Sequence, residues 1–252
     1  MSFTFRSMLL PLSALGEPGA AMDVAGSRYP VRAVAGLLLS ITVLGAASLP
    51  RILALLGMTL APVGSPLAAA HAAALHDGLV RYVVADRLLP PPPLVLAAVL
   101  VALVATPMLA ARRVAWTAVC GVLAVGAAPL VVQRLGELIV VWTTPADDLV
   151  AGDVASLATR FNVGLAGILS AAGRTPDGAW GIAADATNAI GLWVVALWGW
   201  GLARLDRDAA AVSGRAARVV WPFMLSAAAY AAGYAVYAAL LPTWLLLVMG
   251  VP

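Results

Sequence analysis

The chain has 252 residues, of which 63% are hydrophobic and 11% charged, with a net charge of +3 and a mean hydropathy of +0.98. Soluble domains are about 45–50% apolar and about 25% charged, so a water-soluble globule is excluded. All 15 basic residues are arginine, which excludes P-loop and Schiff-base chemistry because both need a lysine. The single cysteine, Cys120, cannot form an internal disulfide. These features predict an all-α, polytopic transmembrane helical bundle.

Residues 1–30 precede the first long apolar stretch. A short apolar run over residues 8–15 follows a single arginine and leads into a Glu-Pro-Gly turn. A signal peptide can contain such a run. The weak basic start favours instead a cytoplasmic N-terminal segment that lies at the membrane interface. Residues 31–252 then form the transmembrane domain.

Five stretches are apolar enough to cross a bilayer, which takes about 20 helical residues. They are residues 33–57, 94–111, 114–142, 186–203 and 219–241. Pro50 predicts a kink in the first span. The second and third spans form a helical hairpin, because only a short turn at Arg112-Arg113 separates them.

The arginines predict the topology. Positive charge is concentrated on the cytoplasmic side of membrane proteins. Nine of the fifteen arginines lie in segments that an N-in, C-out arrangement places there: Arg6, Arg28, Arg32, Arg112, Arg113, Arg204, Arg207, Arg215 and Arg218. No basic stripe with interleaved aromatic residues is present, so no nucleic-acid partner is expected.

Two segments, 61–93 and 143–181, are predicted to lie outside. Residues 67–89 have the pattern of an amphipathic helix on the outer membrane surface, ended by four consecutive prolines at 90–93. The apolar run 161–172 is too short to span the bilayer. It is a re-entrant helix, an interfacial helix or part of a longer tilted helix.

The histidines are weak metal candidates. His71 and His76 are five residues apart, so on a helix they point about 140° away from each other. They lack the shared face of a zinc-binding helix and are predicted to be solvent-facing polar residues. We expect no metal and no cofactor.

Arg134 and Glu137 are the main functional candidates within a span. At a spacing of three residues they can meet on one helix face. Ionisable residues inside the membrane are often functional. Alternatively, this part of the helix reaches the outer headgroups and the pair extends into them.

The last two spans carry further polar and aromatic candidates. Asp185 and Asn188 precede the fourth span, where capping of the helix N-terminus is favoured over ligand binding. Tyr230, Tyr234 and Tyr237 share one face of the fifth span, beside a pair of small residues at Ala229 and Gly233. This pattern favours helix packing, within the protein or with a partner, over a cofactor site.

The sequence lacks the GxSxG, HExxH, EF-hand and GxGxxG motifs. It also lacks the matching interrupted repeats of many transporters. We therefore expect a protein that is not an enzyme.

The run NAIGLWVVALWGWGL at residues 188–202, which includes Trp193, resembles the F-x-L-W-x-x-x-L-x-x-x-G-L pattern of bacterial Yip1-domain membrane proteins. A basic loop and a last span containing an aromatic residue, Trp221, follow in the same order. Ile190 stands where that pattern has an aromatic residue, and segment 143–181 has no counterpart. The resemblance implies an auxiliary or scaffold protein of the bacterial cytoplasmic (inner) membrane, with other integral membrane proteins as partners.

Some bacterial members of that family are linked to MacB-type ABC exporters and their adaptors. The leading hypothesis is accordingly a non-enzymatic subunit of a larger membrane complex, associated with such an exporter. The alternative is a small transporter or channel that uses Arg134 and Glu137.

Overall fold

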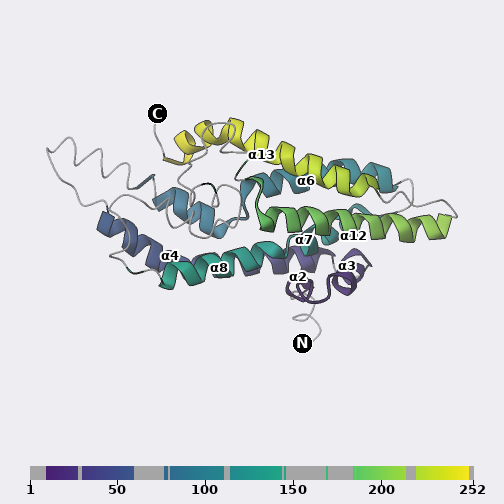
Figure 1. Cartoon of the computed structure of the whole chain (residues 1–252), viewed down its shortest axis with the longest axis horizontal. Coiled ribbons are helices and arrows are strands. Elements are labelled where there is room, and N and C mark those ends of the chain that lie inside the picture. Colours follow the sequence, from purple (N-terminus) through teal and green to yellow (C-terminus); the bar gives the residue numbers. More distant parts are fainter. Residues whose placement is uncertain are drawn as a thin grey trace.

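Figure 1 shows the computed structural model of the chain. The structure describes residues 10–27, 30–59, 77–78, 80–110, 114–143, 145, 169, 184, 186–213 and 220–249. Within these ranges the chain is helical and contains no β-strand, which confirms the predicted all-α class. The helices are α2 (Leu10–Ser13), α3 (Pro18–Ser27), α4 (Pro30–Thr59), α6 (Pro92–Ala110), α7 (Trp116–Gly126), α8 (Pro129–Thr143), α12 (Ala189–Ser213) and α13 (Val220–Met249). A further helix covers residues 80–88.

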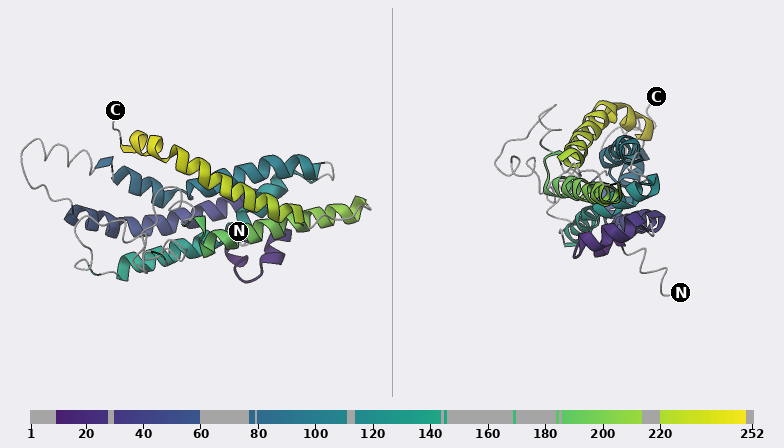
Figure 2. Two further views of the ribbon diagram at one scale, coloured as in Figure 1. Left: turned by 45° about the horizontal axis from the view of Figure 1, so that its top comes forward. Right: turned by 90° about the vertical axis from the view of Figure 1, so that its right-hand side faces the viewer.

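Five stretches of these helices are long and apolar enough to cross a membrane, as the sequence predicts. They are Pro30–Ala54, Pro92–Leu109, Trp116–Thr143, Ala189–Asp208 and Val220–Leu240. The chain is therefore a multi-pass membrane protein. In Figures 1 and 2 the helices lie roughly parallel, with α4, α7–α8 and α13 running one way along the bundle and α6 and α12 the other. This alternation agrees with the predicted order of crossings.

α4 continues through Pro50, as the predicted span 33–57 requires. Two other spans differ in detail from the prediction. The third span consists of two helices, α7 and α8, because the chain turns at residues 127–128 ahead of Pro129. α12 extends to Ser213, ten residues beyond the predicted end of the fourth span at 203.

The third span forms the centre of the bundle. In its most apolar part 78% of the residues are buried, against 22% in the fifth span. Trp198 of α12 is almost fully buried beside α7, and its indole Nε1 donates a hydrogen bond of 2.8 Å to the Leu123 carbonyl. Gly126 permits this approach, since a Cβ there would lie 2.5 Å from the Trp198 ring. Large apolar side chains such as Leu103 and Ile139 face outward, as helices in lipid require.

The described part of the N-terminal segment packs against the same core. Met22 of α3 is fully buried, and α3 contacts α7 and α12. Asp23 forms an ion pair of 2.6 Å with Arg204 of α12, whose guanidinium also lies over the Trp200 ring. Residues 10–27 therefore pack against α4, α7 and α12.

Candidate functional site

The candidate site begins with an interruption of the backbone between helix 80–88 and α6. In a continuous helix each carbonyl accepts a hydrogen bond from the N–H four residues later. Residues 90–93 are all proline and have no N–H. The carbonyls of residues 86–89 therefore have no donor in the helix. Hydrogen bonding restarts at Pro91, whose carbonyl accepts from Leu94 N at 3.0 Å.

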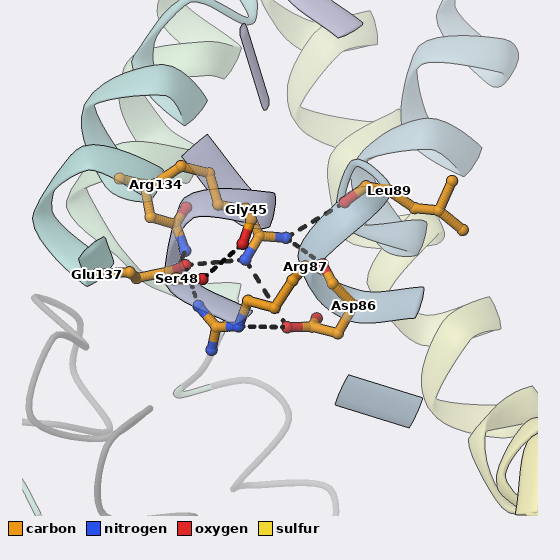
Figure 3. A network of polar contacts seen from close by, with 8 residues as sticks. Gly45, Ser48, Asp86, Arg87, Leu89, Arg134 and Glu137 are labelled. Atoms are coloured by element: carbon orange, nitrogen blue, oxygen red, sulfur yellow. Dashed lines mark hydrogen bonds and ion pairs between the residues drawn. The ribbon is translucent and has the colours of Figure 1, made fainter. Parts of the chain in front are cut away.

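Arg134 of α8 supplies donors to two of these four carbonyls. Its Nη2 donates to the carbonyl of Asp86 and, at 3.2 Å, to that of Leu89. The side chain is only 6% exposed, so it points into the bundle (Figure 3). Arg134 thus caps the C-terminus of a helix that is 45 residues away in the sequence.

Helix α4 contacts the other two carbonyls. Thr42 Oγ1 donates a hydrogen bond of 3.1 Å to the Leu88 carbonyl. The Arg87 carbonyl lies directly against the backbone of Gly45, where a Cβ would be 1.7 Å from the oxygen. Any larger residue at position 45 would displace helix 80–88. Of the four carbonyls left by the prolines, those of Asp86, Leu88 and Leu89 accept hydrogen bonds from α4 and α8, and that of Arg87 lies against α4.

The charged groups around this cap pair with one another. Glu137 Oε2 accepts from Arg87 Nη1 at 2.6 Å and from Arg134 Nη1 at 2.8 Å. The Asp86 carboxylate lies 3.4 Å from Arg87 Nε and 3.7 Å from Arg134 Nη1. Gln133 Nε2 donates to the second Glu137 oxygen at 3.0 Å. We call Asp86, Arg87, Arg134 and Glu137 the charge cluster; its formal charge is zero.

The charge cluster lies at membrane depth. Gly45 is about 5 Å from the midpoint of the span Pro30–Ala54, at about 1.5 Å per residue. Glu137 is about 11 Å from the midpoint of the span Trp116–Thr143 on the same scale. The hydrocarbon layer extends about 15 Å to either side of its centre. The cluster therefore falls within the half of the span that the predicted topology places toward the outside. Charges at such a depth are stable only when paired.

The structure brings Arg134 and Glu137 together as the sequence predicts, but they point inward rather than toward headgroups. It adds Asp86, Arg87 and Gln133, which the sequence alone did not assign to this site. Residues 80–88 were predicted to lie on the outer surface. Instead Val83 is buried among α4 and α8, in contact with Ile52 and Val141.

A second polar site joins α12 and α13. Asn188 Oδ1 accepts a hydrogen bond of 2.6 Å from Gly191 N, which is the helix cap that the sequence predicts. The Tyr230 hydroxyl donates to the Ala186 carbonyl at 2.9 Å and lies 3.5 Å from Asn188 Nδ2. A Cβ at residue 191 would lie 1.8 Å from this hydroxyl. The site therefore fixes how the start of α12 packs on α13.

The remaining aromatic candidates do not form one site. The Tyr234 ring packs against that of Tyr230 in a tilted arrangement, with centroids 4.9 Å apart and planes at 49°. Tyr237 lies one turn further along, beside Tyr82 and Asp86 at a small cavity of about 20 Å³. Trp193 is 40% exposed on the outside of α12.

Several candidates lie outside the described residues: Asp185, His71, His76 and, apart from residue 169, the run 161–172. In the part of the chain that is described, no group of three His, Cys, Asp or Glu residues could hold a metal ion.

Two hollows open between helices. The first, of about 250 Å³, has an apolar lining from α4, α6 and α7, and both helix interruptions border it, through Pro90 and Ala127. The second, of about 570 Å³, lies between α12 and α13. Tyr230, Tyr234 and four alanines of α13 line it.

Comparison with known proteins gives no match: no family model, no curated protein and no solved structure matches the chain. The resemblance of residues 188–202 to Yip1-domain proteins gains no support from these comparisons.

Proposed function

We propose that this chain is a non-enzymatic auxiliary or scaffold subunit of a larger membrane complex. The observation that carries the proposal is the hollow between α12 and α13. On α13 it is lined by Ala227, Ala231, Ala235 and Ala238. Small residues at this spacing allow the backbone of another helix to approach closely, and van der Waals packing of this kind drives association in lipid.

The way the polar residues are used supports the same proposal. The four charges of the charge cluster pair with one another. Asn188 and Tyr230 bond to the backbone at the start of α12. These groups hold helices in position, which fits a protein whose role is contact with neighbours.

The partner we propose is another integral membrane protein. A permease or adaptor of a MacB-type ABC exporter in a bacterial inner membrane is the specific candidate. This partner rests on the resemblance of residues 188–202 to Yip1-domain proteins alone.

The test compares two leucine substitutions on α13. Ala231→Leu fills the hollow, whereas Ala228→Leu adds the same bulk at an exposed position outside its lining. Each variant is extracted from native membranes in a mild detergent, and its complexes are measured by native mass spectrometry. We expect a complex larger than the monomer that Ala231→Leu weakens and Ala228→Leu preserves. A partner-free monomer for the unmodified protein would refute the proposal.

The alternative function is a small transporter or channel that uses Arg134 and Glu137. The observation in its favour is that both helix interruptions border one hollow, since transporters often place their sites between broken helices. Ion and solute flux through proteoliposomes tests it, with Glu137→Gln beside the unmodified protein. No flux in the unmodified protein, or equal flux in both, would exclude the alternative.

A further inference from the structure

We propose that helix 80–88 is a hinged element that docks onto the bundle and undocks from it as a unit, with the non-helical residues 89–91 as the hinge. Arg134 and Glu137 form the latch that keeps the element docked, while α6 stays in the bundle. This inference goes beyond the proposed function and does not depend on it.

The backbone supports the hinge. Leu89 N donates to the Ala85 carbonyl and closes helix 80–88. The next helical bonds start at the Pro91 carbonyl. The prolines have no N–H, so the helical hydrogen bonds of the two helices cannot join across them. Helix 80–88 can therefore move without breaking any helical hydrogen bond of α6.

Side-chain packing divides at the same place. Leu94, Ala97 and Val101 of α6 belong to the main core of the bundle. Val83 belongs to a separate small cluster with Ile52 and Val141. Since elements with few apolar contacts open at lower free energy than the core, helix 80–88 should open first.

Several polar contacts from other helices hold helix 80–88 in place. Arg134 donates to its last carbonyls, Glu137 pairs with Arg87, and Thr42 donates to Leu88. When the element undocks, its last carbonyls and the Arg87 side chain lose these partners, so Arg134, Glu137 and Thr42 set the free-energy cost of undocking.

A small cavity lies beside the hinge. The cavity between Tyr82, Asp86 and Tyr237 has a volume of about 20 Å³, which is room for one water molecule. The Asp86 side chain is 36% exposed. Asp86 of the charge cluster therefore borders a small cavity between helix 80–88 and α13.

The first test uses the unmodified protein in nanodiscs. Hydrogen–deuterium exchange is followed by mass spectrometry for peptides that cover residues 80–89 and 94–109. We expect the amides of 80–89 to exchange faster by about tenfold or more, because they open without the main core. Equal protection of the two peptides would overturn the hinge.

The second test measures thiol accessibility in a Cys120→Ala background. Val83→Cys reports on helix 80–88 and Ala97→Cys, at a fully buried position of α6, is its matched control. A water-soluble methanethiosulfonate labels each variant with and without Glu137→Gln. The hinge predicts that Glu137→Gln raises labelling at position 83 by about tenfold and leaves position 97 unchanged.

A rise at both positions, or at neither, would overturn the proposal. If Glu137→Gln does not give a folded protein on size exclusion, Thr42→Val replaces it, because it removes a single bond of the docked state. We then expect a rise of about threefold at position 83 alone, and the same two outcomes count against the hinge.

Discussion

The two interrupted helices of this bundle differ in what satisfies the backbone carbonyls at the break. At α7–α8 a single proline, Pro129, removes the donor for one carbonyl, that of Val125. The chain turns more tightly, and Ala128 N donates to that carbonyl at 3.1 Å. At helix 80–88 four prolines remove four donors. Arg134 and Thr42 on other helices donate to three of the carbonyls, and the fourth lies against Gly45 of α4.

The difference shows that the number of lost N–H donors decides whether nearby backbone or side chains of other helices supply the hydrogen bonds. One carbonyl can be reached by a neighbouring N–H through a turn with i to i+3 bonding. Four consecutive carbonyls cannot, because no N–H remains nearby. In lipid an unsatisfied backbone group costs several kcal/mol, so donors must come from side chains. A guanidinium, with five N–H groups in a fixed fork, can serve two carbonyls and a carboxylate together.

Of the substitutions at the two interruptions, Arg134→Met is expected to destabilise the protein most. The change leaves the carbonyls of Asp86 and Leu89 without their side-chain donor and removes one of the donors to the Glu137 carboxylate. We expect a loss of about 3–5 kcal/mol in the free energy of unfolding, as for other broken buried ion pairs. Thermal unfolding in detergent measures it. The control is Arg207→Met on the exposed side of α12, and equal unfolding midpoints for the two variants would contradict the account.

Gly45→Ala is expected to have the next largest effect. The new Cβ would lie 1.7 Å from the Arg87 carbonyl oxygen and 2.6 Å from its carbon. Neither atom belongs to a flexible side chain, so helix 80–88 must shift, at a cost of about 1–3 kcal/mol. Gly16→Ala is the control, because its Cβ would meet only the Ser13 carbonyl, at 3.9 Å. A thermal midpoint for Gly45→Ala equal to that of Gly16→Ala would show that the close contact is not needed.

Thr42→Val tests the hydrogen bond to one of the four carbonyls, that of Leu88. It keeps the side-chain shape but removes the hydroxyl that donates to Leu88. We expect a loss of about 1 kcal/mol, in the range found for hydrogen bonds between membrane helices. Thr117→Val, on the exposed face of α7, should change the midpoint less. A larger change of the midpoint for Thr117→Val than for Thr42→Val would show that the Leu88 carbonyl does not require the Thr42 hydroxyl.

Pro129→Ala should have the smallest effect, since the Val125 carbonyl already has a donor. We expect the free energy of unfolding to fall by about 0.4–1 kcal/mol, because alanine gives the unfolded chain more conformational freedom than proline. Thermal unfolding again provides the measurement. If Pro129→Ala were as costly as Arg134→Met, the two interruptions would not differ as described.

The sequence predicts the spans well because the bilayer sets a simple length and polarity requirement. The second span, predicted at 94–111, is found at Pro92–Leu109. The meeting of Arg134 with Glu137 was also predictable, because a spacing of three residues is a local property of a helix.

The partners of that pair could not be predicted. Arg87 is 50 residues from Glu137, and nothing local places helix 80–88 beside α8. Its charged residues and the prolines after it resemble a surface helix, which is why an interfacial position was predicted. The usable signal was the proline run itself, because four missing N–H groups at a span boundary require donors from elsewhere.

The Arg134 guanidinium caps the broken helix. Chemical rescue of Arg134→Ala tests it most directly, because this variant leaves a space the size of a guanidinium beside the carbonyls of Asp86 and Leu89. Thermal unfolding is measured with millimolar methylguanidinium, and with methylammonium as the matched cation. We expect methylguanidinium, but not methylammonium, to raise the unfolding midpoint of Arg134→Ala. Neither cation should raise the midpoint of the unmodified protein. A midpoint for Arg134→Ala that falls or stays constant with both cations would contradict this role of Arg134.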